Sequence, residues 1–284
     1  MEIRPAVEAD LPAAYLVFQR AIEELYQRHR FEPPRPPETL FVRQHAHLLD
    51  HDAGRFWVAA EGDRVVGFSA AFVREDAWYL SALFVTPEHQ AGGVGKDLLA
   101  QVWAGDLEIR RRITIVDAIQ PVSTGLYSRA GLLPVTPLMN LAGEPKIAQG
   151  HDLEPGPLED VAVAELDRAA YGFDRAPDHA FWRAEARGTV WKAEGEPVAY
   201  SYRWPGGRLG PVGGRTPEAC RQALEAELAR SEGHFVNLVV PASARQALAV
   251  ALGAGLRYSD PPGLILSTDE AGPSSLVPHG YALF

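Results

Sequence analysis

Residues 85–96 read Val-Thr-Pro-Glu-His-Gln-Ala-Gly-Gly-Val-Gly-Lys, with three glycines within four positions. This stretch separates an apolar segment over 77–85, which is typical of a strand, from the start of a helical pattern. Gly92, Gly93 and Gly95 carry no side chain to block close approach, so backbone N–H groups can converge there on an anion. Each charge-assisted N–H bond contributes about 1.5–3 kcal/mol, against about 0.3–1 kcal/mol from the helix dipole. The converging bonds therefore decide the site, and the expected ligand is a diphosphate.

Two nucleotide-binding motifs use a similar loop, and neither fits this one. A Walker A loop needs Gly five residues before its Gly-Lys pair and Ser or Thr after it, whereas Gln90 and Asp97 stand at those places. The dinucleotide fingerprint beginning at Gly93 needs a third small residue where Leu98 stands. The residues therefore exclude both nucleotide classes.

The loop does resemble the Gln/Arg-x-x-Gly-x-Gly/Ala pattern of the GNAT acetyltransferases, with Gln90, Gly93 and Gly95 at the defined positions. Other segments between residues 3 and 142 resemble the family in the same order: 3–11, Val66-Gly67, 83–87 and 126–132. The resemblance implies acetyl-CoA as co-substrate, with its diphosphate on the loop and its pantetheine arm along the preceding strand. The residues that the resemblance assigns to the coenzyme are Leu83, Phe84, Val85, Gln90, Ala91, Gly92, Gly93, Val94, Gly95 and Lys96.

The second half of the chain repeats features of the first half. Residues 60–69 resemble 193–201, and residues 127–137 resemble 251–261. The tripeptide 85–87 is echoed by Leu209-Gly210-Pro211. Because the three echoes occur in the same order, they predict two copies of one fold. The predicted fold is α/β, with two GNAT-like domains, each a mixed, mostly antiparallel twisted sheet flanked by helices.

The expected domain ranges are 1–145 for an acetyl-CoA-binding domain, 146–156 for a linker and 157–284 for a degenerate second copy with a tail. The second copy departs from the family where the first copy matches it. Its loop reads Gly214 to Ala219, in which Pro217 removes an N–H donor. We therefore predict that the second copy shapes the substrate cleft without turning over acetyl-CoA.

Tyr127 is the predicted catalytic residue, because the resemblance places it where the family has a tyrosine that donates to the leaving sulfur. An ordinary phenol pKa near 10 would keep it protonated at neutral pH. The resemblance also implies that the backbone N–H of Val85 polarises the acyl carbonyl. The general base is unassigned: many family members carry Glu in the strand before the loop, whereas Ser81 and Ala82 stand there. The acids that qualify by charge alone are Glu23, Glu24, Glu75 and Asp76.

Composition limits the partners. The chain carries 27 Lys and Arg against 37 Asp and Glu, a formal net charge of −10, which is poorly suited to nucleic acid. A single cysteine, Cys220, excludes a cysteine-built zinc site, and His45, His47 and His51 lack the spacing of a ligand set, so no metal is expected. No secretion signal or membrane-length apolar stretch is visible, so we expect a cytoplasmic protein. The oligomeric state is open, with a homodimer as one option.

The leading prediction is an N-acetyltransferase that moves an acetyl group from acetyl-CoA to a primary amine of a small molecule or peptide, with Tyr127 as general acid. A non-catalytic acyl-CoA-binding or regulatory module is an alternative, because the usual strand carboxylate is missing. A tandem acyltransferase that uses another acyl donor is a third reading.

Overall fold

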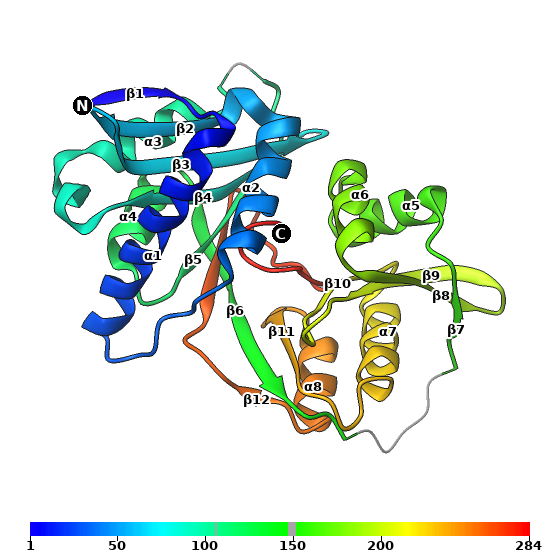
Figure 1. The fold of residues 1–284 in the computed structure, drawn as a ribbon. Coiled ribbons are helices and arrows are strands. Elements are labelled where there is room, and N and C mark those ends of the chain that lie inside the picture. The colour runs from blue at the N-terminus through cyan, green and yellow to red at the C-terminus, as the bar shows by residue number, and fades with distance from the viewer. Residues whose placement is uncertain (106, 147–151) are drawn as a thin grey trace. The chain divides into compact units, whose positions relative to one another are not determined.

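The computed structural model describes residues 1–105, 107–146 and 152–284, which form two compact units. Unit 1 comprises Met1–Thr114 and Ile119–Leu132, and unit 2 comprises Ile115–Ala118 and Leu133–Phe284. Figure 1 shows their elements. Each unit contains mainly antiparallel strands with helices packed against them, so the predicted α/β class is confirmed.

The strands of unit 1 lie in the order β1-β2-β3-β4-β5, and all neighbours are antiparallel except β4 and β5, which are parallel. The predicted strand over 77–85 is confirmed at both ends. In chain order the elements are β1 (Glu2–Pro5), η1 (Glu8–Asp10), α1 (Leu11–Arg28), α2 (Glu38–Asp52), η2 (Ala53–Arg55), β2 (Phe56–Glu61), β3 (Arg64–Arg74), β4 (Ala77–Val85), η3 (Pro87–Gly92), α3 (Val94–Val102), β5 (Arg111–Asp117) and α4 (Pro121–Arg129).

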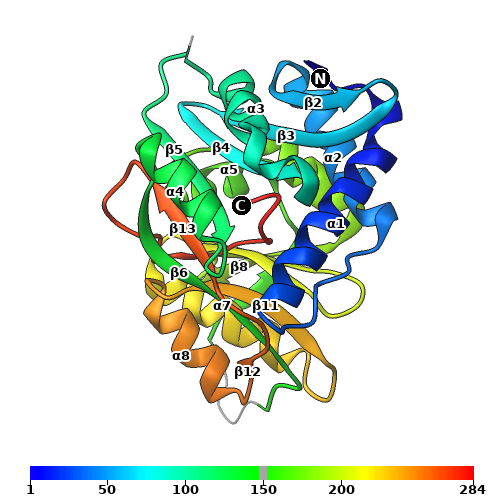
Figure 2. The ribbon, with the colours of Figure 1, turned by 90° about the vertical axis from the view of Figure 1, so that its left-hand side faces the viewer.

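Helices cover both faces of this sheet. On one face, the Phe84 ring of β4 lies 5.0 Å from Phe18 of α1 and 5.6 Å from Phe68 of β3, as ring centroids. On the other face, α3 runs along β2, β3 and β4 (Figure 2). There a Cβ atom on Gly67 would stand 3.1 Å from Leu98 Cδ1, so the glycine lets α3 approach β3 closely. Strand β4 is therefore held from both sides by packing.

Unit 2 contains a sheet in the order β14-β10-β9-β8-β7, and a second set of strands in which β6 lies antiparallel between β13 and β11. Its remaining elements in chain order are β6 (Leu133–Gly143), β7 (Glu154–Gly156), α5 (Asp160–Ala170), α6 (Ala176–Glu185), β8 (Arg187–Ala193), β9 (Glu196–Arg203), β10 (Leu209–Gly214), α7 (Pro217–Ala229), β11 (Val236–Pro241), α8 (Arg245–Gly253), β12 (Arg257–Tyr258), β13 (Gly263–Ser267) and β14 (Leu276–Val277).

Strand β6 belongs to unit 2, although it directly follows α4 of unit 1 in the chain. It pairs with β11 from Val236↔Gly143 to Pro241↔Leu138. The segments of the two compact units thus alternate along the sequence. The ranges 1–145, 146–156 and 157–284 remain a prediction of where each copy of the fold begins and ends. Residues 147–151 of the predicted linker lie outside the described residues, while its end forms β7.

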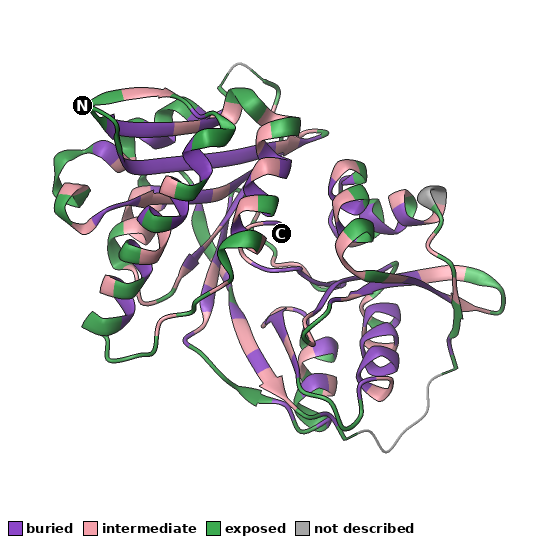
Figure 3. Cartoon of the chain, in the orientation of Figure 1, coloured by how far each residue is buried: buried purple, intermediate pink, exposed green. Residues whose placement is uncertain are grey.

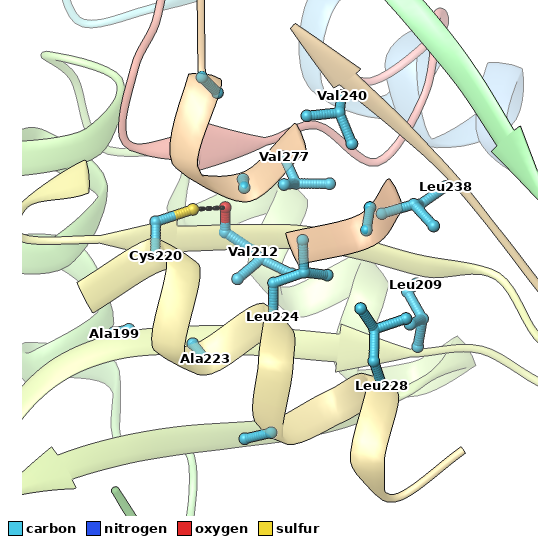
Figure 4. Close-up of a cluster of buried hydrophobic side chains, with 14 of the residues drawn as sticks. Ala199, Leu209, Val212, Cys220, Ala223, Leu224, Leu228, Leu238, Val240 and Val277 are labelled. Atoms are coloured by element: carbon cyan, nitrogen blue, oxygen red, sulfur yellow. Dashed lines mark hydrogen bonds between the residues drawn. The ribbon is translucent and has the colours of Figure 1, made fainter. Parts of the chain in front are cut away.

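The core of unit 2 is built around α7, which is buried over most of its length (Figure 3). Cys220 of α7 directs its Sγ toward the Val212 carbonyl oxygen at 3.8 Å, and Leu224 continues the same apolar side (Figure 4). Burial raises the pKa of the Cys220 thiol to about 12, which keeps it protonated and unreactive. This cysteine is therefore a packing residue.

Candidate functional site

The candidate site begins where the described pairing of β4 with β5 ends. The two strands pair from Ala77↔Arg111 to Leu80↔Thr114. Ser81 follows as an extra residue, because the register of β3 against β4 shifts between residues 70 and 71. A bulge of this kind bends a strand and increases its local twist. Strand β4 therefore changes course at Ser81, immediately after its last described pair with β5.

Beyond the bulge, the backbone of β4 points alternately to β3 and to its other edge. Thr86 N–H donates to the Val66 carbonyl of β3 at 2.9 Å. Phe84 stands two residues earlier, opposite Phe68, so its backbone groups point to the same side, toward β3. Leu83 and Val85 therefore turn their N–H and C=O groups away from β3. An extended ligand can therefore hydrogen-bond to this edge in the way that an additional strand would. Phe84, also assigned to the coenzyme from the sequence, commits its backbone to β3 instead.

The glycine loop ends in the first turn of α3. Gly93 adopts φ +84°, a conformation that favours glycine, and its carbonyl accepts from Lys96 N–H at 2.9 Å and Asp97 N–H at 3.1 Å. Earlier N–H groups of a first turn have no partner within a helix and can bind an anion. A Cβ on Gly95 would stand 3.4 Å from Leu83 Cδ2, so the helix begins in contact with β4. The loop is thus built as an anion cradle beside the β4 edge.

Two side chains fasten this loop. Gln90 Nε2 donates to the Val85 carbonyl oxygen at 3.0 Å, which assigns Gln90 a supporting role in the free protein. His89 Nδ1 lies 2.8 Å from Thr86 Oγ1, and its Nε2 lies 3.3 Å from Glu61 Oε2. His89 was not among the predicted site residues. Its signal in the sequence is the Thr-x-x-His spacing across the end of the strand. Ala91, Gly92 and Lys96 are exposed on the loop, where a ligand can reach them.

Tyr127 lies on α4 and is only 4% exposed. Burial raises its pKa well above 10, and a hydrogen bond with Ser123 opposes that shift only in part. The expected pKa near 10 is therefore too low, because burial disfavours the phenolate. The hydroxyl is therefore protonated at neutral pH, as predicted, and its pKa lies further above 7 than expected.

The four acids that qualified by charge fall into two places. Glu23 and Glu24 line an open groove of about 370 Å³ on α1, together with Arg20, Gln27, Arg28 and Pro87. Glu75 and Asp76 lie in the turn before β4, at the end of the strand opposite the loop. At about 3.3 Å per residue, the nine-residue strand puts that turn roughly 30 Å from the glycine loop. Glu75 and Asp76 are therefore poor candidates for the general base.

The corresponding edge in unit 2 is occupied by the chain itself. Strand β10, which precedes α7 as β4 precedes α3, pairs on this edge with β14: Val212 opposite Val277 and Gly213 opposite Leu276. Val277 is fully buried in the same cluster as Val212 and Val240 (Figure 4). The backbone groups on this edge of β10 are therefore paired within unit 2 by β14.

The loop of the second copy is also closed. The Oγ1 atom of Thr216 accepts from Ala219 N–H at 3.1 Å, which fills part of the first turn of α7. A Cβ on Gly214 would stand 2.3 Å from Cys220 N, so strand and helix meet without room for a phosphate. One sequence echo is out of register: in the tripeptide 85–87, Val85 ends β4 and Pro87 begins η3, whereas Leu209-Gly210-Pro211 begins β10. The similarity between 60–69 and 193–201 does match equivalent hairpins.

In the described ranges, no group of three His, Cys, Asp or Glu side chains is placed to hold a metal ion. His45 is buried against Phe41, with ring centroids 3.8 Å apart, and burial lowers its pKa to about 4. His45 is thus a neutral packing residue. Over the same ranges, no helix is both long and apolar enough to span a membrane.

Residues 20–132 match the acetyltransferase (GNAT) family, so the segment that holds the loop, β4 and Tyr127 is a GNAT acetyltransferase domain. The predicted family is thereby confirmed. GNAT acetyltransferases use acetyl-CoA and an amine acceptor. A comparison with curated proteins found no match.

Solved structures extend the likeness to the whole chain. A candidate acetyltransferase from Pyrococcus horikoshii is 16% identical, with a TM-score of 0.79 over 100% of this chain and 95% of that one. A GCN5-related N-acetyltransferase from Sphaerobacter thermophilus is 16% identical, with a TM-score of 0.66 over 97% of both chains. A tandem GNAT protein from the clavulanic acid biosynthesis pathway is 18% identical, with a TM-score of 0.57 over 96% of this chain and 99% of that one. The fold is therefore that of a tandem GNAT protein, as predicted.

Proposed function

We propose that the protein is an acetyl-CoA-dependent N-acetyltransferase whose acceptor is a primary amine of a small molecule or peptide. The observation that carries the proposal is the β4 edge beyond Ser81, which leads directly into the cradle at Gly93. Leu83 and Val85 offer backbone groups along an extended arm, and the first turn of α3 offers N–H groups to a diphosphate. Lys96, exposed at that turn, adds a positive charge beside the phosphates.

In this proposal acetyl-CoA supplies the thioester and its thiol leaving group. Val85 N–H polarises the acyl carbonyl oxygen, as an oxyanion donor does. The acceptor nitrogen forms a bond to the acyl carbon while the carbon–sulfur bond breaks, and the sulfur takes a proton from Tyr127. The acceptor nitrogen gives its surplus proton to water, since β4 has Ser81 and Ala82 where a carboxylate would stand. The phenol then recovers a proton from solvent.

The test is thiol release from acetyl-CoA across a panel of aminoglycosides, polyamines, amino acids and peptides. We expect turnover with one acceptor class, and a loss of at least tenfold in kcat for Tyr127→Phe with little change in KM for acetyl-CoA. Tyr258→Phe is the matched control, because Tyr258 is 55% exposed on β12. A Tyr127→Phe enzyme within twofold of wild type would remove Tyr127 from the mechanism.

The missing strand carboxylate favours one other function, a module that binds acyl-CoA without turnover. Thiol release separates the two proposals, because both predict that calorimetry detects acetyl-CoA binding and only the first predicts thiol release. We expect one acetyl-CoA per chain, since β14 occupies the β10 edge. Two equivalent sites per chain would show that the second copy binds the coenzyme as well.

A further inference from the structure

Unit 2 contains a group of polar atoms that acetyl transfer does not use. Arg208, directly before β10, donates from Nε to the His279 carbonyl oxygen at 2.9 Å and from Nη1 to Asn237 Oδ1 at 3.1 Å. Its Nη2 also bonds the same carbonyl oxygen. The guanidinium group is thus fixed in place by neutral acceptors and keeps further N–H bonds to offer, since it has five in all.

The positive charge of Arg208 has no acidic partner among the ion pairs of the described residues. Burial is the main reason that its pKa is lowered to about 10. Arg175, also in unit 2, shows the contrasting case: it contacts Asp167 at 2.8 Å, and this pair is fully buried. A partly buried cation held only by neutral groups leaves its charge uncompensated, and an anion would correct this.

Two more polar atoms lack partners, one on the ring of His279, whose carbonyl Arg208 binds, and one on Trp182, whose ring neighbours that of His279. Trp182 Nε1 and His279 Nδ1 are buried without a hydrogen bond to any described group. The two rings are nearly parallel, with centroids 6.1 Å apart, and Trp204 packs on the His279 ring at 4.5 Å. Buried polar atoms are almost always paired in native proteins, so two such atoms in one cluster require a partner.

We propose that the Arg208 cluster, formed by Arg208, His279, Trp182 and Trp204, binds a small organic carboxylate. Every unfilled atom in it can donate: the guanidinium N–H groups, the indole N–H and, in one tautomer, His279 Nδ1–H. A group made only of hydrogen-bond donors is best matched by a ligand that only accepts hydrogen bonds. One uncompensated positive charge matches one carboxylate, whose planar fork fits a guanidinium group, whereas a phosphate dianion would leave a charge over. The rings of Trp182 and Trp204, which pack against His279, favour an acid with an apolar or aromatic body.

The experiment is calorimetric titration of the full chain with benzoate and phenylacetate, and with their uncharged amides at the same concentrations. We expect saturable binding of at least one carboxylate and at least tenfold weaker binding of its amide. Inorganic phosphate is the competing anion. Absence of binding by both carboxylates, or phosphate binding as tightly as they do, overturns the proposal.

Variants locate the site. Arg208→Gln should weaken carboxylate binding at least tenfold, and Trp182→Phe, which keeps a buried ring but removes the N–H donor, should weaken it severalfold. Arg187→Gln is the matched control, because Arg187 is an exposed arginine of the same unit, at the start of β8. Binding that is unchanged in both test variants would place the carboxylate elsewhere. If Arg208→Gln does not fold, Trp182→Phe and the carboxylate–amide comparison still decide.

Discussion

Gln90 fastens the glycine loop to strand β4, because its Nε2 donates to the Val85 carbonyl oxygen at 3.0 Å. Gln90→Ala removes this bond and loosens the cradle. A lost hydrogen bond of about 1–1.5 kcal/mol corresponds to roughly a tenfold rise in KM for acetyl-CoA. We expect kcat to stay within about twofold, since Gln90 does not donate to the reacting atoms. Steady-state kinetics with Gln101→Ala, an exposed glutamine on α3, as control would measure this. An unchanged KM would show that the loop holds its shape without Gln90.

Gly93 is the residue whose conformation starts α3, with φ +84°. An L side chain there costs about 1–2 kcal/mol of backbone strain. Gly93→Ala should therefore lower the melting temperature by a few degrees and weaken acetyl-CoA binding more than tenfold, as the cradle shifts. Gly54→Ala is the matched control, since a Cβ at Gly54 meets nothing within 4 Å and its φ is unstrained. Equal melting temperatures and equal affinities for the two variants would contradict this role for Gly93.

Short-range sequence patterns predicted two parts of the site, the glycine loop and the apolar strand before it. The loop at Gly92–Gly95 and the strand over 77–85 are both where the sequence indicated. The bulge at Ser81 was not predicted, because serine there has no signature that separates an extra residue from a paired one. The buried state of Tyr127 also lies beyond a local pattern, since the residues that cover it come from tertiary packing.

Long-range pairing limited the fold prediction in the same way. Strand β14 is two residues long and lies in a stretch that reads as an irregular tail, yet it closes the β10 edge. Similarly, β6 falls within the first predicted domain, 1–145, whereas the compact units place it in unit 2, where it pairs with β11. The residues in and around β14 and β6 do not by themselves indicate which strand each will pair with. The sequence therefore predicts two copies more reliably than it predicts which strands each compact unit contains.

The pKa of Tyr127 gives a prediction for the rate profile. Because burial raises this pKa well above 10, the phenol stays protonated from pH 6 to pH 9.5. The rate should rise over this range as the acceptor amine loses its proton, and no loss from tyrosine ionisation should appear. Tyr127→Phe should show the same profile shape, lower by a constant factor. A wild-type decline below pH 9.5 that is absent from the variant would show that Tyr127 ionises in that range.

The pair Arg4–Asp10 predicts how acid affects unit 1. Arg4 Nη1 and Nη2 contact the two carboxylate oxygens of Asp10 at 2.7 and 2.8 Å, and Val7 N–H donates to one of them at 2.9 Å. The hydrogen bonds from Arg4 lower the pKa of Asp10 below its ordinary value of 3.8, despite opposing desolvation. A lowered folded-state pKa stabilises the protein above pH 3.8, and that contribution is lost as pH falls through the folded-state pKa.

Asp10→Asn should therefore destabilise the protein at pH 7 by about 1 kcal/mol, a modest value because Arg4 is partly exposed. The difference from wild type should shrink between pH 4 and pH 2, where the wild-type carboxylate also becomes protonated. Urea unfolding at pH 7, 4, 3 and 2 would measure it, with Glu8→Gln as the control because Glu8 is an exposed acid in the same turn. A difference of the same size at pH 2 as at pH 7 would mean that Asp10 acts through packing and not through its charge.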